Sequence, residues 1–396
     1  MPEIALGESR ETSPGPLDGL VVADFTRVLA GPYCTMLLAD MGAEVIKVES
    51  RDGDDARHWV PPLRGDVGTY YLAVNRNKRS IVLDLGDEAD AAVARALSER
   101  ADVFIHNFRP GSLDKFGLGY DAVADRNPRS VYCSISGFGA AQGASLPGYD
   151  LLVQAMSGLM SLTGSPDGPP YRAGISVFDV MTGLHSAIGI LAALHHRDVT
   201  GEGQHVETNL LSTALSALVN QTSAYVAGGV VPHRMGNAHL SLFPYEPLAT
   251  GDGNLIVAIG NDRQFRKLCD ALEVPELADD ARFATVGQRN DNREQLRPLL
   301  LTRLASRSAQ DWFTIFSAAG IPCGPINDVR GGVELAGRLG LEPVVMAGDI
   351  PTVRNPIRMS VTPARYDLPP PALDADGDAV RAWLGFGPDQ PAAPGS

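Results

Sequence analysis

An aspartate at the start of an apolar helix is the residue of this sequence best placed to do chemistry. Residues 171–178 predict a short extended run that ends just before Asp179, and apolar residues then recur at helical spacing from Leu184 to Leu194. Ligands of α/β folds bind at such junctions, because free backbone N–H groups and the positive end of the helix dipole face the crevice there. The setting predicts an ionised carboxylate that is directed outward. The alternative is an ordinary N-cap aspartate.

The elements before Asp179 predict a parallel α/β sheet. Strand and helix patterns alternate along the first part of the chain, which is typical of β-α-β units and of a doubly wound fold. No G-x-G-x-x-G opens the first helix, so the sequence disfavours a Rossmann dinucleotide site. The expected strands are 20–25, 43–49, 80–85, 102–105 and 131–135, and the expected helices include 32–41 and 88–100; a further helix is expected after Asp179, at 210–226.

Length, composition and charge exclude several classes of protein. The 396 residues are long enough for two domains, and 44% hydrophobic with 20% charged residues is typical of soluble globular proteins. A net charge of −14 disfavours nucleic acid or an anionic membrane as a partner, because both require a basic surface. We expect no membrane span, since no apolar run is judged long enough to cross a bilayer, and no signal peptide. A cytoplasmic protein is expected.

The cysteines and histidines do not predict a metal site. The four cysteines are far apart and form no C-x-x-C pair, and the eight histidines include no H-E-x-x-H. Thiols in a reducing compartment are the expected interpretation, and Cys323 is expected to pack rather than to act as a nucleophile.

Seven sequence blocks occur in an order that resembles the class III CoA-transferase family of the CaiB/BaiF type. This family includes formyl-CoA transferase, carnitine CoA-transferase and α-methylacyl-CoA racemase, and the resemblance extends from Leu17 to about Leu384. Seven blocks in register are a more specific signal than any single motif. The blocks are VADFTRVLAGPYCTMLLADMGAEVIKVE (22–49), NRNKRSIVLDL (75–85), HNFRPGSLDKFGLGYD (106–121), PGYDLLVQAMSGLMSLTG (147–164), GISVFDVMTG (174–183), TGEGQHVETNLL (200–211) and GIPCGPIND (320–328).

The resemblance implies that Asp179 is the nucleophile of a CoA-transferase. The family's carboxylate attacks an acyl-CoA, so that the acyl group is held as a mixed anhydride while CoA is free. Tyr149 stands where the racemases have a histidine, which disfavours α-proton exchange, and Asp150 matches an acidic position beside the active site. The alternatives are a half-buried core tyrosine for Tyr149 and a cap of the following helix for Asp150. Backbone N–H groups after Asp179, or a lid, are expected to bind the oxyanions.

The resemblance also places the CoA contacts. They fall on Asn107, Phe108, Arg109 and Lys115, with Arg51 next to another contact, and the alternative for each basic residue is a solvated surface charge. CoA is expected as a substrate, with no permanently bound cofactor. Further cations that could meet its phosphates are Lys47, Arg76, Lys78 and Arg79.

Departures from the family pattern limit the choice of acid. Leu29 replaces a glutamine of formyl-CoA transferase, and no run of four glycines is present, so oxalate and formate are disfavoured. Residues 234–246 replace that glycine lid, where Asn237 and His239 either line the acid pocket or are simple loop residues. We expect CoA transfer from an acyl-CoA to a small carboxylic acid, with a dicarboxylate preferred. The alternatives are an acyl-CoA racemase or epimerase and a non-catalytic protein that binds CoA ligands.

The expected architecture is a Rossmann-like doubly wound large domain with a smaller α+β domain. By the resemblance, two chains are expected to form an interlocked, ring-shaped homodimer. The expected boundaries are a flexible tail at 1–16, the large CoA-binding domain at 17–208, a linker at 209–235, the small domain at 236–325, a second linker at 326–345, a return to the large domain at 346–387 and a flexible tail at 388–396.

Overall fold

The protein is represented by a computed structural model that describes residues 14–387. The flexible tails expected at 1–16 and 388–396 fall almost wholly outside the described residues. The chain forms two compact units. The first consists of the chain up to Leu159, of Ala173–Gly228 and of the chain from Glu342 onward, and the second consists of Met160–Arg172 and Gly229–Leu341.

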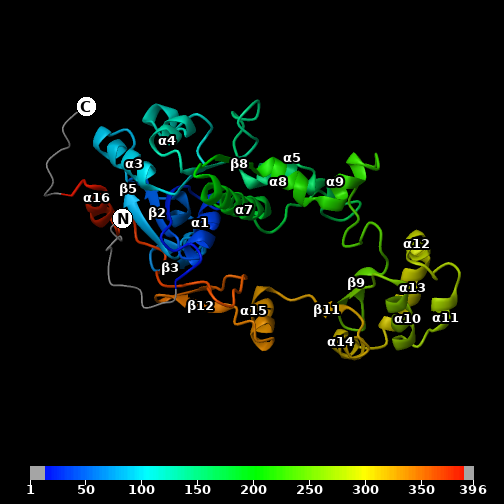
Figure 1. Ribbon diagram of the computed structural model, residues 1–396. Coiled ribbons are helices and arrows are strands. Elements are labelled where there is room, and N and C mark those ends of the chain that lie inside the picture. The colour runs from blue at the N-terminus through cyan, green and yellow to red at the C-terminus, as the bar shows by residue number, and fades with distance from the viewer. Residues whose placement is uncertain (1–13, 388–396) are drawn as a thin grey trace. The chain divides into compact units, whose positions relative to one another are not determined.

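Six parallel strands form the central sheet of the first unit (Figure 1). Their order is β5-β2-β1-β6-β7-β8, so the chain starts in the middle at β1, moves outward to one edge and then crosses to the other side with β6. This order places a topological switch point between β1 and β6, and the predicted parallel α/β sheet is confirmed. The strands are β1 (Val21–Phe25), β2 (Glu44–Glu49), β5 (Lys78–Val82), β6 (Val103–His106), β7 (Val131–Ser136) and β8 (His205–Asn209).

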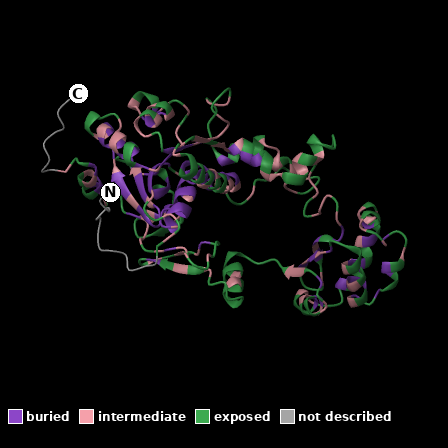
Figure 2. Cartoon of the chain, viewed as in Figure 1, coloured by how far each residue is buried: buried purple, intermediate pink, exposed green. Residues whose placement is uncertain are grey.

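Helices cover both faces of this sheet, whose central strands β1 and β6 are buried along their whole length, while the edge strand β8 is partly exposed (Figure 2). Alternate residues of β1 point to opposite cores: Val22 packs with α1 (Ala30–Asp40) and α7 (Val177–Thr200), while Ala23 packs with the helices of the other face. Those helices are α3 (Glu88–Arg100), α4 (Tyr120–Arg126) and α16 (Gly377–Leu384). Burial on both faces explains why the strands read as continuous apolar runs.

Helix α7 begins earlier than the sequence predicts. Residues 171–176 form no strand, the N-cap is Ser176, and Asp179 lies in the first turn of the helix. The expected strand is therefore wrong, and so is the alternative that Asp179 is the N-cap. The physical reason is local: Ala173 N–H and the Ile175 carbonyl bond to the side chain of Gln154 rather than to a neighbouring strand.

Helix α7 is also long and apolar enough, by length and composition alone, to cross a membrane, which the sequence analysis did not anticipate. One face of it is buried in the core of the first unit, where Ala187, Ile190 and Leu194 pack. Core helices of globular proteins satisfy the same criterion, so the apolar composition of α7 is weak evidence for a membrane span.

The remaining elements of the first unit are short. The helix expected over 210–226 is divided into α8 (Leu210–Ala217) and α9 (Val219–Val226), because Val219, the first residue of α9, has a φ of 39°. These two helices occupy most of the segment expected as the first linker. The elements are η1 (Asp55–His58), β3 (Leu63–Arg64), β4 (Val67–Gly68), α2 (Thr69–Leu72), η2 (Asp114–Phe116), α5 (Asp150–Met156), α8 (Leu210–Ala217), α9 (Val219–Val226), β12 (Val344–Ala347) and β13 (Ile350–Val353).

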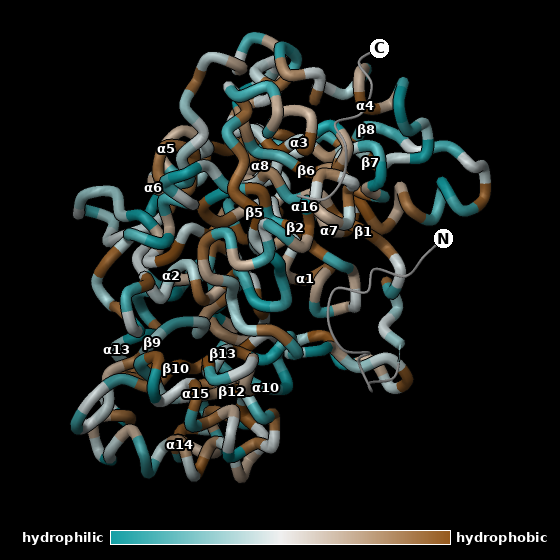
Figure 3. Tube along the Cα trace, turned by 90° about the vertical axis from the view of Figure 1, so that its left-hand side faces the viewer, coloured by the Kyte–Doolittle hydropathy of each residue, from teal (hydrophilic) through white to brown (hydrophobic). Residues whose placement is uncertain are grey.

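The second unit has a core of its own, built from a three-stranded antiparallel sheet and several helices. Hydrophobic and hydrophilic residues alternate along its chain (Figure 3), as expected for helices that bury one face. Its strands are β9 (Tyr245–Ala249), β10 (Asn254–Ala258) and β11 (Cys323–Pro325), and its helices are α10 (Asp262–Ala271), α11 (Glu276–Asp279), α12 (Val286–Asp291), α13 (Arg293–Leu304), α14 (Ala309–Ala318) and α15 (Val329–Arg338); α6 (Leu159–Leu162) joins the two units in sequence.

Candidate active site

A cavity of about 390 Å³ lies in the first unit at the carboxyl ends of the parallel strands. The loops after β1, β6 and β7 line it, so it occupies the crevice at the topological switch point, where ligands of open α/β sheets bind. Six residues that the sequence singles out meet there: Asn107, Phe108, Arg109, Tyr149, Asp150 and Asp179.

Asp150 and Asp179 have different environments in this cavity. Asp150 is buried, and its Oδ1 accepts hydrogen bonds from the backbone N–H groups of Phe178 and Asp179, at 2.8 and 3.1 Å. Its Oδ2 accepts a bond of 2.5 Å from the Gln154 side chain. Asp150 therefore caps a helix, as one interpretation proposed, but the helix is α7 rather than its own α5. The first turn of α7 is thus occupied by the carboxylate of another element.

This arrangement changes the charge state expected for Asp179. Burial, followed by the nearby charge of Asp150, raises the pKa of Asp179 to about 7. Contrary to the expectation, the helix N-terminus does not hold the pKa of Asp179 low, and the group ionises only near neutral pH. The physical reason is that the stabilising N–H groups are given to Asp150, which adds a negative charge beside the second carboxyl group.

The N–H groups around Asp179 are also not free to bind an oxyanion. Those of Phe178 and Asp179 donate to Asp150, and that of Val180 donates to the carbonyl of Ser176. The sequence suggested two sources of oxyanion donors, the backbone N–H groups after Asp179 and a lid. The N–H groups of the first source already donate to other groups of the chain.

Tyr149 lies at the mouth of the cavity. It is the N-cap of α5 and the residue is 66% exposed, so the alternative of a half-buried core tyrosine is wrong. Two aromatic residues that the sequence analysis did not single out also line the cavity. The Tyr70 hydroxyl bonds to Ser176 and Tyr70 packs edge-on against Trp59 at 5.2 Å. Neither residue belongs to a motif that would have marked it.

The loop between β1 and α1 forms another wall and is held in a strained conformation. Val28 has a φ of 71°, a left-handed backbone that β-branched residues rarely adopt. Its N–H donates to both carboxylate oxygens of Asp54, at 3.1 and 3.2 Å. Lys47 bonds Asp54 at 2.9 Å and the Thr26 carbonyl at 2.8 Å, and Lys47 and Asp54 are fully buried. A buried ion pair therefore fixes the conformation of this wall.

Two glycines allow the wall after β7 to approach the start of α5. A Cβ on Gly137 would lie 2.4 Å from the Cα of Gly148, which is closer than real Cβ atoms come to a backbone atom. The Gly137-Phe138-Gly139 stretch does not form a dinucleotide fingerprint; it lines the cavity that contains Asp179. The Gly137–Gly148 approach places Tyr149 and Asp150 beside that cavity.

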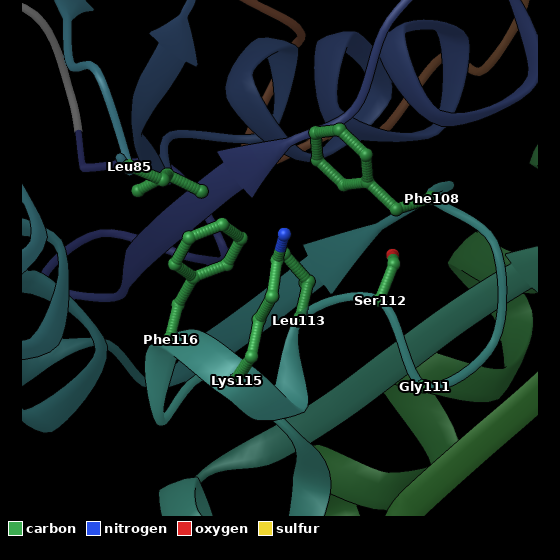
Figure 4. A pocket seen from close by; sticks show the side chains of 7 residues that line it. All are labelled: Leu85, Phe108, Gly111, Ser112, Leu113, Lys115 and Phe116. Atoms are coloured by element: carbon green, nitrogen blue, oxygen red, sulfur yellow. The ribbon is translucent and has the colours of Figure 1, made fainter.

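A second cavity of about 380 Å³ lies next to the first and shares Phe108 with it. The Lys115 side chain extends toward the space between Phe108 and Phe116 (Figure 4), and its Nζ lies 4.6 Å from the centroid of the Phe116 ring. An exposed cation between aromatic rings and the apolar Leu85 suits a ligand that has both an anionic group and a flat ring.

The other expected CoA contacts occupy different positions. The side-chain amide of Asn107 donates to the Arg27 carbonyl at 2.7 Å and accepts the Arg27 N–H at 3.0 Å. These two bonds join the loops after β1 and β6. Arg109 is exposed at the first cavity, as is Arg27, whose guanidinium lies 5.7 Å from the Phe108 ring. Arg51 lines neither cavity and pairs with Asp84 at 3.6 Å, next to Leu85 of the second cavity.

Four of the basic residues proposed as further phosphate contacts are unsuited to that role. Lys78 pairs with Asp24 and, like Lys47, is fully buried, and burial lowers its pKa to about 8. Arg76 pairs with Asp40 at 2.6 Å, and Arg79 pairs with Glu44 and Asp376. The sequence shows these charges but not their partners, which lie on other elements. They hold the fold together instead of meeting a ligand.

Metal ligation finds no support in the part of the chain that the structure describes. Within residues 14–387, no group of three or more His, Cys, Asp or Glu side chains could hold a metal ion.

Comparison with known proteins agrees with this geometry. Residues 17–377 match the family model described as CoA-transferase family III. A succinate–glutarate CoA-transferase of Agrobacterium fabrum is 44% identical over 383 residues, which cover 93% of this chain and 96% of that protein. A succinyl-CoA:mesaconate CoA-transferase of Haloarcula hispanica is 41% identical and covers 79% of this chain and 81% of its own. A crystal structure of a CaiB/BaiF family protein from Brucella suis is 42% identical, with a TM-score of 0.84 over 94% of this chain and all of that one.

Proposed function

The chain belongs to CoA-transferase family III, and from this premise we propose that it moves CoA between an acyl-CoA and a dicarboxylic acid with Asp179 as the nucleophile. The observation that carries the proposal is the position of Asp179: it lines a cavity at the switch point, and that cavity shares Phe108 with a second one that contains an exposed cation. One cavity suits the reacting end of an acyl-CoA and the other suits its phosphorylated end.

The reaction begins when the ionised Asp179 attacks the thioester carbonyl. The C–S bond breaks, CoA leaves as a thiolate, and the acyl group becomes a mixed anhydride with Asp179. The thiolate then attacks the aspartyl carbonyl and releases the first acid, which leaves an aspartyl–CoA thioester. The acceptor carboxylate attacks this thioester to form a new anhydride, and the returning thiolate attacks the new acyl carbonyl to give the product and to regenerate Asp179.

Each intermediate keeps the acyl carbon activated, so little free energy is lost in the cycle, but either one would hydrolyse in contact with water. The tetrahedral oxyanions require donors. Because the N–H groups of Phe178, Asp179 and Val180 donate within the chain, we assign the oxyanion donors to other groups.

The CoA arm is proposed to run between the two cavities. Lys115 meets a phosphate group beside Phe108 and Phe116, on which the adenine can stack. Asn107 holds the loop after β1 in place through its two hydrogen bonds to the backbone of Arg27. Arg51 pairs with Asp84 and is placed at the edge of the proposed CoA site. The pantetheine then leads past Phe108 toward Asp179.

The acceptor is proposed to be a dicarboxylate such as those named for the relatives, succinate, glutarate and mesaconate. Arg27 and Arg109 are the arginines at the first cavity, and both are exposed there, which supports an anionic substrate. Tyr149 lines the same cavity as Asp179, and the described residues that line this cavity include no histidine, which supports transfer over α-proton exchange.

The working form is proposed to be a homodimer, with the interlocked arrangement expected from the resemblance. Large apolar side chains are exposed on the outer surface of α7, α8 and α9, including Ile188 at 65% and Tyr225 at 61% exposure. Apolar surface of this kind is costly to leave in water, and a second copy of the chain would cover it. Sedimentation equilibrium tests the proposal, and a monomer at assay concentrations would refute it.

The test of the function is an assay of acyl-CoA donors against a panel of acids, with Asp179→Ala as the matched variant. We expect transfer from succinyl-CoA to a second dicarboxylate in the wild type, and less than a few per cent of that rate in Asp179→Ala. CoA binding and the circular dichroism spectrum should be retained by the variant. Substantial transfer by Asp179→Ala would remove Asp179 from the nucleophile role.

A further inference from the structure

The side chain of Gln154 connects three parts of the chain beside the nucleophile. It lies in α5, one turn after Asp150, and it is completely buried. Its Oε1 accepts the N–H of Ala173 at 2.8 Å, which leaves the Nε2 group to donate to Asp150 at 2.5 Å and to the carbonyl of Ile175 at 3.1 Å. Helix α5 is thereby fastened to the segment that enters α7.

This amide also determines which carboxylate occupies the N-terminus of α7. An acidic residue in the first turn of a helix, such as Asp179, is favoured by the free N–H groups and the helix dipole. Asp150 takes two of those N–H groups, and Gln154 holds the second oxygen of the same carboxylate. The Asp179 side chain is thus left without the partners that would turn it back onto its own helix.

We propose that Gln154 is a positioning residue for the transfer reaction: it holds Asp150 on the first turn of α7 and fixes residues 173–176, so that the Asp179 carboxyl group faces the cavity. This inference rests on the proposed function, because it assumes that Asp179 is the nucleophile. Gln154 itself contacts no substrate in this scheme, since it is buried beneath Asp150.

The groups around Asp179 make the inference measurable. Burial and then the charge of Asp150 on α5 raise the pKa of Asp179, and Tyr70 on α2 interacts electrostatically with Asp179 and bonds Ser176 in the fixed segment. Arg27 and Asp55 line the same cavity. If Asp150 leaves the helix, Asp179 loses a neighbouring negative charge and gains access to the N–H groups. Both changes lower the pKa of Asp179.

The test compares Gln154→Leu with Val153→Ala, which removes apolar packing from the same helix and leaves the polar contacts in place. For Gln154→Leu we expect a loss in kcat of about 100-fold, as for a small misplacement of a reacting group. We also expect the acidic limb of kcat/KM to move to lower pH and the Kd for CoA to stay within about twofold. For Val153→Ala we expect lower thermal stability with the acidic limb unchanged.

Gln154→Glu keeps the test decisive if the leucine variant does not fold. A glutamate has nearly the same shape, but its ionised carboxylate would repel Asp150, so we expect the activity that appears as Asp179 ionises to fall again at higher pH, where the glutamate has lost its proton. A Gln154→Glu profile that parallels the wild type at every pH would overturn the proposal, as would a Gln154→Leu loss with no movement of the acidic limb.

Failure of this inference can be told apart from failure of the proposed function. Hydroxylamine trapping of the wild type after incubation with succinyl-CoA reports on Asp179 alone. A labelled Asp179 together with unchanged pH profiles in the Gln154 variants refutes the positioning role and retains the nucleophile. An unlabelled Asp179 in the wild type refutes both.

Discussion

The carboxylate of Asp150 accepts the backbone N–H of Asp179 at 3.1 Å, across 29 residues of sequence. One of two neighbouring acids therefore holds the helix end, and the other, Asp179, has its pKa raised to about 7, mainly by burial and then by the charge of the first. Carboxyl pairs whose environments differ in this way commonly have different roles at active sites. The structure thus separates a carboxylate that shapes the site from one available to react.

Replacing Asp150 by asparagine should lower the pH at which the enzyme becomes active. Asparagine keeps an oxygen for the two N–H groups of α7, loses the bond that Oδ2 accepts from Gln154, and removes the charge that adds to burial in raising the pKa of Asp179. The acidic limb of kcat/KM, expected near pH 7 in the wild type, should move toward the ordinary value of an aspartate. A pH series measures this, with Asp198→Asn, an exposed aspartate on the helix of Asp179, as the control. An acidic limb of Asp150→Asn that coincides with the wild type would contradict the role given to this charge.

Replacing Asp179 by asparagine should stabilise the fold at alkaline pH. The folded-state pKa of about 7 lies above the ordinary aspartate value of about 4, so folding disfavours the ionised form. The resulting penalty is absent below about pH 4, grows as the pH rises toward 7 and is complete above it. We expect Asp179→Asn to raise the free energy of unfolding by about 1–2 kcal/mol near pH 8, with little change near pH 4. Urea denaturation at the two pH values measures the difference, and an equal effect at both would contradict the raised pKa.

Lys115→Ala should weaken CoA binding in a salt-dependent way. The Lys115 side chain is exposed, and its attraction to a phosphate is screened by salt. The Kd for CoA should therefore rise more at low ionic strength than at high ionic strength. Calorimetry at two salt concentrations measures it, with Arg263→Ala on α10 as an exposed-cation control. An unchanged Kd at low salt would remove Lys115 from the CoA site.

Lys47→Met should destabilise the fold rather than act through a phosphate contact. Removing the lysine leaves Asp54 as a buried, unpaired charge, which costs about 3–5 kcal/mol. The double variant Lys47→Met, Asp54→Asn should recover part of this loss, because the asparagine can still accept the Val28 N–H. Thermal or urea unfolding gives the three free energies. A single variant as stable as the wild type would show that the ion pair is dispensable.

The sequence predicts elements that depend on neighbouring residues more accurately than contacts that depend on distant ones. The helix expected at 88–100 has those bounds, because Asp87 caps it and its apolar face repeats locally. The strands around the switch point follow from apolar runs that are buried on both faces. In contrast, the start of α7 is determined by Asp150 and Gln154, which belong to another helix.

The candidate site shows the same division. The resemblance places Asp179, Tyr149, Asp150 and the 107–109 group around one cavity, and the structure brings them together. The electrostatics could not be foreseen, because Lys47 and Lys78 look like ligand cations until their buried partners Asp54 and Asp24 are seen.

The central claim is that Asp179 carries the acyl group or CoA in every turnover. Its most direct test is mass spectrometry of the peptide that contains Asp179, after incubation with an acyl-CoA and trapping with hydroxylamine. The account predicts a hydroxamate on Asp179 that requires the acyl-CoA and that is absent when free acid is supplied alone. Active transfer with an unmodified Asp179, or with the label on another residue, would contradict it.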